Sequence, residues 1–120
     1  MKIIIADNNA WEKSLDLDKA VVRIGSSAAS DVQLASPDIA PVHLQIHYLP
    51  EELGCRVLNL GSDVKVLRGE YQDVVRSYAR AELENGDEIF LGEYRIRLEL
   101  PFTTKTIQTS PAISAALVFP

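Results

Sequence analysis

The fold class is decided by one continuous segment, Glu84-Asn85-Gly86-Asp87-Glu88-Ile89-Phe90-Leu91-Gly92-Glu93-Tyr94-Arg95-Ile96-Arg97-Leu98-Glu99-Leu100. Apolar and charged residues alternate from Tyr94 to Leu100, which is typical of a β-strand with one buried face and one face in water. Asn85-Gly86 and Gly92-Glu93 are residue pairs that favour tight hairpin turns. The segment therefore predicts a strand over 88–91, a two-residue turn and a second strand over 94–100.

Similar short strand signals, separated by turn residues, recur through the rest of the chain. β-Branched runs and alternating apolar positions predict strands over 2–6, 12–17, 20–24, 32–34, 44–48, 56–58 and 64–67, and around Val74. Between 73 and 79, Val74, Val75 and Tyr78 fit either a strand or a short helix. Many short strands with few helix signals are typical of a β-sandwich or barrel, so we expect an all-β fold.

The length and composition fit one folded domain. A chain of 120 residues with 47% hydrophobic and 24% charged side chains can build one hydrophobic core. After Leu100 the composition changes: residues 101–111 are rich in Thr, Ser and Pro, which is typical of a connector, and residues 112–120 are apolar. We therefore assign residues 1–100 to the domain and 101–120 to a linker or tail.

The charge balance argues against nucleic acid and membrane surfaces as partners. The chain has 17 acidic and 12 basic residues and a formal net charge of -5, which repels anionic polymers and lipids. No apolar stretch approaches the roughly 20 residues that span a bilayer, so we expect no membrane insertion in this segment. Cys55 is the single cysteine, which excludes an internal disulfide and favours a reducing, cytoplasmic location.

The sequence does not predict an enzyme, a metal site or a cofactor. Ser62 lacks the sequence context of a catalytic nucleophile. His43 and His47 share one face of a predicted strand without a carboxylate placed to orient either ring. Two histidines and scattered acidic residues also lack the spacing of a metal site. We therefore expect a non-catalytic binding module.

Four separated segments resemble the signature of the forkhead-associated (FHA) domain family, in the family's order. The first is similar to its Gly-Arg-Ser loop and Asn-Asp-Ile-x-Leu strand, and the second to Val-Ser-Arg-x-His-Ala-x-Ile. The third is similar to Asp-Leu-Gly-Ser-Thr-Asn, and the fourth to Asp-Gly-Asp-x-Ile-x-Leu-Gly. In this chain the four segments are Ile24-Gly25-Ser26-Ser27-Ala28-Ala29-Ser30-Asp31-Val32-Gln33-Leu34, Ile39-Ala40-Pro41-Val42-His43-Leu44-Gln45-Ile46, Asn59-Leu60-Gly61-Ser62-Asp63-Val64 and Glu84-Asn85-Gly86-Asp87-Glu88-Ile89-Phe90-Leu91-Gly92.

The resemblance implies a fold and a set of structural residues. FHA domains are twisted β-sandwiches of about eleven strands, of the SMAD/FHA-like type, with the binding loops at one end and both termini at the other. Gly25 and Gly61 would allow tight turns that let backbone amides face outward. His43 would brace the binding loops through its ring nitrogens, and Ser62 belongs to the same structural set.

The residues at the family's phosphothreonine contacts have all changed. FHA domains hold the ligand with an arginine, a serine and a Thr-Asn pair, and this chain has Ser26, Ala40, Asp63 and Val64 at those positions. Hydrogen bonds to charged groups contribute roughly 1.5–3 kcal/mol each, so losing the arginine and serine contacts costs on the order of 3–6 kcal/mol. That is roughly two to four decades of affinity, and Asp63 adds repulsion against a dianion. We therefore predict an FHA domain without its usual phosphothreonine site.

The expected function is protein–protein interaction, as one piece of a larger regulatory or membrane-associated bacterial protein, independently of phosphothreonine. The alternative is a phosphothreonine-peptide-binding signalling domain with atypical contacts, in which Lys65 or Arg68 helps a serine-rich loop to hold the anion. The sequence predicts neither the identity of the partner nor the oligomeric state. The predicted partner-contact residues are Ser26, Ser27, Ala40, Pro41, Asp63, Val64 and Lys65.

Overall fold

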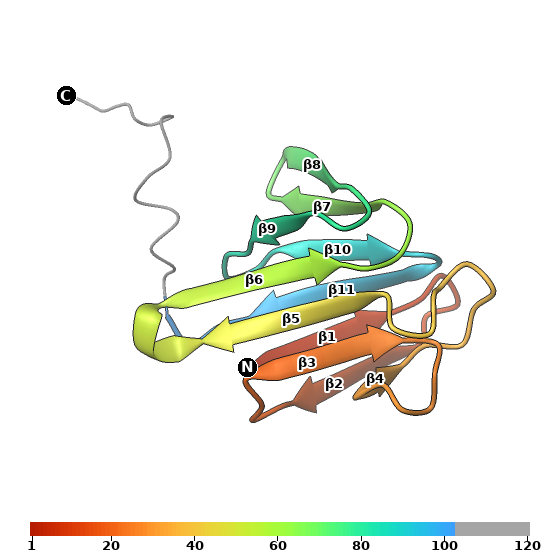
Figure 1. Ribbon diagram of the computed structural model, residues 1–120, viewed down its shortest axis with the longest axis horizontal. Helices are drawn as coiled ribbons and strands as arrows, with labels where there is room; N and C mark the ends of the chain where they lie inside the picture. The colour runs from red at the N-terminus through yellow and green to blue at the C-terminus, as the bar shows by residue number, and fades with distance from the viewer. Residues whose placement is uncertain (103–120) are drawn as a thin grey trace.

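Eleven strands and one short 3-10 helix form the part of the chain that this computed structural model describes, residues 1–102 (Figure 1). The fold is all-β, as predicted. The expectations for residues 103–120 lie outside the described residues. The elements are β1 (Lys2–Ala6), β2 (Glu12–Asp16), β3 (Val21–Gly25), β4 (Val32–Gln33), β5 (Leu44–Leu49), η1 (Pro50–Glu52), β6 (Gly54–Asn59), β7 (Val64–Arg68), β8 (Tyr71–Val75), β9 (Arg80–Glu82), β10 (Glu88–Leu91) and β11 (Tyr94–Glu99).

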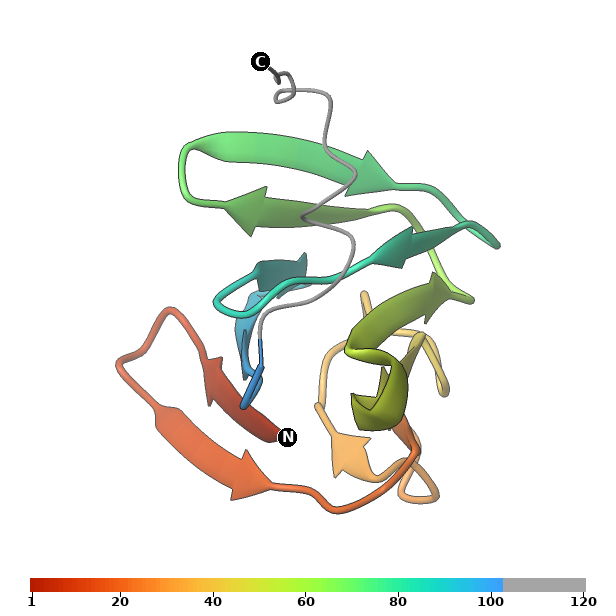
Figure 2. The same ribbon diagram turned by 90° about the vertical axis from the view of Figure 1, so that its left-hand side faces the viewer.

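The strands form two sheets that pack face to face as a sandwich. The six-stranded sheet has the order β2-β1-β11-β10-β7-β8, and the five-stranded sheet has the order β4-β3-β5-β6-β9. Neighbouring strands are antiparallel, except that β3 and β4 pair in parallel. Figure 2 shows the molecule from the end that carries the N-terminus and η1. The opposite end carries the β3–β4, β4–β5 and β6–β7 loops, which we call the apical loops.

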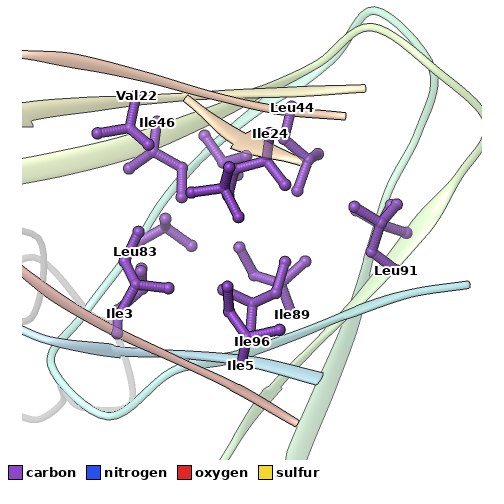
Figure 3. Packing of buried hydrophobic residues seen from close by; sticks show 14 of the residues in the cluster. Ile3, Ile5, Val22, Ile24, Leu44, Ile46, Leu83, Ile89, Leu91 and Ile96 are labelled. Atoms are coloured by element: carbon purple, nitrogen blue, oxygen red, sulfur yellow. The ribbon is translucent and has the colours of Figure 1, made fainter. Parts of the chain in front are cut away.

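The core lies between the two sheets. Figure 3 shows side chains of the five-stranded sheet facing those of the six-stranded sheet across this layer. Strand alternation explains the pattern, because every second residue of each central strand points inward and is buried while its neighbours are more exposed. The facing side chains are Val22, Ile24, Leu44 and Ile46 from one sheet and Ile3, Ile5, Ile89 and Ile96 from the other.

The hairpin that decided the fold class is present as predicted. Leu91 and Tyr94 pair across the two-residue turn, so β10 and β11 are joined at Gly92-Glu93. Gly92 has φ 59° and Gly86, in the preceding turn, has φ 88°, a backbone region that residues with a Cβ rarely enter. At the Gly86 turn, the side chain of Asn85 accepts the Leu100 backbone N–H at 2.8 Å and so links the turn to the end of β11.

Two local features differ from the sequence-based expectation. Residues 71–75 form a strand, so the short-helix alternative for 73–79 is wrong, and the chain turns after Val75. β9 was not predicted, because its three residues are too short for an alternating pattern to be recognised. Within residues 1–102, no helix has the length and hydropathy required to cross a membrane.

Candidate functional site

His43 connects two of the apical loops. It is 1% exposed, and its Nδ1 accepts the backbone N–H of Ala40 at 3.0 Å. Because Nδ1 accepts, the proton lies on Nε2, which donates to the backbone carbonyl of Ser62 at 2.9 Å. The neutral ring therefore ties the β4–β5 loop to the β6–β7 loop.

Gly25 allows the β3–β4 loop to pack directly against the β4–β5 loop. A Cβ at Gly25 would lie 2.1 Å from the carbonyl oxygen of Pro41, so only glycine fits. The backbone N–H groups of Ser26 and Ser27 donate to the carbonyls of Ala40 and Pro41 at 3.0 and 3.1 Å. These two amides hold the loops together and are therefore not presented to an external anion.

The serine side chains of the β3–β4 loop support its own conformation. Ser30 is buried, and its hydroxyl donates to the Pro41 carbonyl at 2.9 Å. The hydroxyl of Ser27 accepts the Ala29 backbone N–H at 3.1 Å. Arg68, suggested above as a helper cation, makes two hydrogen bonds to the buried Asp87 at the far end of β7. The prediction that Arg68 helps this loop to hold an anion is therefore wrong.

Asn59 organises the β6–β7 loop and was not singled out from the sequence. Its side chain is fully buried, and its Nδ2 donates to the carbonyls of Ser62 and Val75 at 2.8 and 2.9 Å. Its Oδ1 accepts the Gly61 backbone N–H at 3.0 Å. The carbonyl of Ser62 thus accepts from both Asn59 and His43. The available signal was a polar residue directly after the strand predicted over 56–58 and two positions before Gly61-Ser62.

The side chain of Asp63 is bonded to the turn that follows β8. Its Oδ1 accepts the Ser77 backbone N–H at 3.0 Å, and its Oδ2 lies 3.3 Å from the guanidinium of Arg76. The same turn exposes Tyr78, which has a left-handed backbone with φ 66° and donates its N–H to the Asn59 carbonyl. Arg76 and Tyr78 therefore belong to the apical surface, although the sequence did not place them there.

Val64 is a correction to the predicted contact set. It is 3% exposed and belongs to the core, so its side chain cannot contact a partner. The reason is strand alternation: β7 begins at Val64, which points inward, while Lys65 points outward over the ring of Phe90. Of the other predicted contact residues, Pro41, Asp63 and Lys65 are exposed and Ser26, Ser27 and Ala40 are half-buried.

Comparisons with known proteins agree with the fold. The FHA domain model matches residues 22–92. The FhaA FHA domain, in a complex with the intracellular domain of Rv3910, is 16% identical with a TM-score of 0.60 over 79% of this chain and 97% of its own. The FHA domain of CT664 from Chlamydia trachomatis is 20% identical with a TM-score of 0.59 over 85% and 100% of the two chains.

A third similar structure is the N-terminal FHA domain of Rad53p from S. cerevisiae, solved with a phosphothreonine peptide. It is 16% identical with a TM-score of 0.60, over 82% of this chain and 94% of that chain. No curated protein matches the sequence. These likenesses support the fold, and the match over residues 22–92 covers more than half of the sequence. The chain belongs to the FHA domain family.

Proposed function

We propose that this FHA domain is a protein–protein interaction module that binds its partner through the apical loops without requiring phosphothreonine. The observation that carries the proposal is the position of Asp63, an exposed carboxylate in the β6–β7 loop. A phosphate brought to that loop would meet a negative charge in place of a neutral hydroxyl. The amides of Ser26 and Ser27, which could otherwise bind an anion, are already bonded to Ala40 and Pro41.

The proposed contact surface follows from exposure. It consists of the predicted residues without Val64, and it extends to the turn after β8, where Arg76 and Tyr78 are exposed. An exposed tyrosine that is anchored through its backbone suits an interface, because tyrosine provides a large contact area at a low cost in conformational entropy. The surface is therefore Ser26, Ser27, Ala40, Pro41, Asp63, Lys65, Arg76 and Tyr78.

The proposed context is a larger regulatory or membrane-associated bacterial protein, in which the domain lies in the cytoplasm. The Thr-, Ser- and Pro-rich composition of residues 101–111 supports a connector to another segment. The single, buried Cys55 is compatible with a reducing compartment.

A second candidate function is phosphopeptide binding with atypical contacts, and Arg76 favours it. Its side chain is 77% exposed, and among residues 1–102 its ion-pair partner is Asp63. Exposed ion pairs contribute about 1 kcal/mol or less, so a phosphate could draw Arg76 away from Asp63. In that case one guanidinium would replace the arginine that the family places in the β3–β4 loop.

Titration with phosphothreonine and unphosphorylated peptide libraries tests both functions. The first proposal predicts no phosphate-dependent binding tighter than about 10 μM, because decades of affinity have been lost. Tighter phosphate-dependent binding would overturn it. The Arg76→Ala variant then tests the second candidate: loss of that binding would assign the phosphate contact to Arg76, and unchanged binding would exclude it.

A further inference from the structure

The outer face of the five-stranded sheet carries two rows of side chains. Pairing of β3, β5, β6 and β9 aligns one residue from each strand across the sheet. The residues that alternate with the buried ones point away from the core. We call these two rows the arginine face. One row is Arg23, Gln45, Leu58 and Arg80, and the other is Val21, His47, Arg56 and Glu82.

The arginine face is basic although the chain is acidic. It holds three arginines and one glutamate, in a chain whose formal net charge is -5. Arg56 is paired with Glu82 at 3.1 Å. Arg23 and Arg80 are exposed, and neither forms an ion pair within residues 1–102. Two guanidinium groups are therefore available to an acidic ligand.

Within residues 1–102, the acidic side chain bonded to Arg23 is that of Asp31, which contacts the Arg23 backbone and pairs with Lys19. Asp31 accepts the Arg23 backbone N–H at 2.8 Å, and its other oxygen is bonded to Lys19. Asp31 thus pairs with Lys19 and with the backbone of Arg23, and the guanidinium of Arg23 forms no ion pair with this carboxylate.

A hollow opens between the two rows, next to Leu58 and Arg80 of the first row. Its volume is about 90 Å³, and it is lined by His47, Arg56, Leu58 and Arg80. This exceeds the roughly 10–15 Å³ that one water molecule needs, so an apolar side-chain tip can enter. Leu58 gives the hollow an apolar wall, whereas its rim is cationic.

The spacing of the two unpaired arginines matches an extended peptide. Arg23 on β3 and Arg80 on β9 lie three strand spacings apart, which is roughly 14 Å at about 4.8 Å per spacing. An extended segment that crosses the strands rises about 3.4 Å per residue, so its residues i and i+4 are also roughly 14 Å apart. Residues i, i+2 and i+4 point to one side. Acids at i and i+4 would thus reach Arg23 and Arg80, with residue i+2 above Gln45 and Leu58.

From this match we propose that the arginine face binds an extended segment of a partner protein with the pattern acidic–x–apolar–x–acidic. Sparse carboxylates with an apolar residue between them fit two separate arginines around Leu58. A nucleic acid or an anionic membrane presents dense charge over a wide area, which the overall acidity of the domain repels. The arginine face shares no residue with the apical contact surface defined above, so this proposal goes beyond the function proposed there.

An NMR titration of the whole chain tests the proposal. The probe is the capped synthetic peptide Gly-Glu-Ser-Leu-Ser-Glu-Gly, and the control peptide has lysine in place of both glutamates. We expect the glutamate peptide to shift the backbone amide signals of Arg23, Gln45, Leu58 and Arg80 and to leave those of Ser26 and Ser27 unchanged. The lysine peptide should shift none of them.

Substitutions that reverse the charge of Arg23 and Arg80 test the proposal by mutation. The double variant R23E/R80E should weaken binding of the glutamate peptide by roughly tenfold or more, and R23Q/R80Q should weaken it less. R95E is the matched control, because Arg95 is an exposed arginine on the outer face of the other sheet and has no ion pair within residues 1–102. The affinity of R95E for the glutamate peptide should stay within about twofold of that of the parent.

Several results would overturn the proposal. They are the absence of any shift on the arginine face at millimolar peptide, equal weakening by R95E, and binding of the lysine peptide at the same residues. Tighter binding of single-stranded DNA or phosphatidylserine vesicles to the same residues would assign the face to a different ligand. None of these results bears on phosphothreonine binding at the apical loops, so failure here is distinguishable from failure of the proposed function.

Discussion

The imidazole ring of His43 lies directly against Gly61, with no room for a side chain between them. A Cβ at Gly61 would meet Cε1, Nε2 and Cδ2 of the ring at 2.5–2.6 Å. The ring is held on both sides, by the Ala40 N–H and the Ser62 carbonyl. His43 therefore requires glycine at position 61, and the two residues together fix the β6–β7 loop.

Replacing Gly61 with alanine should destabilise the domain. Gly61→Ala forces the His43 ring away from the Ser62 carbonyl, and overpacking of this kind costs roughly 1–3 kcal/mol. Gly54→Ala is the matched control, because the nearest atoms to a Cβ there lie at 3.9 Å, an ordinary contact distance. Chemical denaturation measures the free energy of unfolding of both variants. Equal stabilities for the two variants would contradict the packing argument.

The sequence predicted the strands because their pattern is local, but it did not predict contacts between distant loops. Alternation from Tyr94 to Glu99 and the Gly92-Glu93 turn are visible within a few residues of one another. Asp63, by contrast, is bonded to Ser77, fourteen positions later. That bond exists only because β7 and β8 pair. The inward orientation of Val64 likewise depends on where β7 begins, and strand boundaries are the least predictable part of a fold.

Removing the arginine that pairs with the buried carboxylate of Asp87 should strongly destabilise the domain. Two nitrogens of Arg68 donate to the carboxylate of Asp87 at 2.9 and 2.8 Å, and Asp87 is fully buried. Arg68→Met leaves this carboxylate without its cation, so we expect a loss of about 3 kcal/mol, and the added Asp87→Asn change should restore part of it.

An ion pair whose carboxylate is partly exposed provides the control for Arg68. Arg56→Met removes the partly exposed pair with Glu82, which should cost about 1 kcal/mol or less. Urea denaturation of the parent and the three variants gives the comparison. A loss of stability for Arg68→Met no larger than that for Arg56→Met would show that burial of Asp87 has little energetic effect.

Asp31 should make the domain sensitive to acid. The hydrogen bond from Lys19, followed by the backbone N–H of Arg23, lowers the pKa of Asp31 from its ordinary value of 3.8. A carboxyl with a lowered folded-state pKa stabilises the fold above its unfolded pKa, and this contribution is lost as the pH falls through the folded pKa. Asp31→Asn should therefore be less stable than the parent at pH 7, and the difference should shrink below about pH 4.

Glu84 titrates in the opposite sense and needs its own comparison. Burial is the main cause that raises the pKa of Glu84, so protonation of this group favours the folded state as the pH falls. Comparing the parent with Asp31→Asn at each pH cancels this contribution, because Glu84 is present in both proteins. A difference in unfolding free energy that stays constant from pH 7 to pH 2 would contradict the role given to Asp31.

The thiol of Cys55 should be inert until the domain unfolds. Cys55 is 1% exposed, and burial is the main cause that raises its pKa to about 12. At pH 8 the reactive thiolate is therefore scarce in the folded state. Alkylation by iodoacetamide should be slow in buffer and fast in denaturing urea, and Gly61→Ala should react faster than Gly54→Ala. Rapid alkylation of the folded parent would contradict this burial.

Phosphothreonine binding should be restored by rebuilding the altered contact positions. The triple variant Ser26→Arg, Ala40→Ser and Asp63→Thr returns a charge-assisted donor and a hydroxyl to the apical loops and removes the carboxylate. The threonine hydroxyl can still accept the Ser77 N–H that Asp63 binds now. Val64→Asn is left out because Val64 is buried, and an unsatisfied amide there would cost roughly 1–3 kcal/mol.

We expect the triple variant to bind a phosphothreonine peptide measurably, and more weakly than a natural FHA domain does, because the surrounding residues were not selected to hold the new side chains. Calorimetry of the parent and the triple variant, against the same peptide with and without phosphate, measures the gain. A variant with Ser26→Arg alone separates the effect of added charge from that of the rebuilt site: it should show less phosphate-dependent gain than the triple variant. If the parent already binds the phosphopeptide, or if the folded triple variant gains nothing that depends on phosphate, the assignment of these positions is wrong.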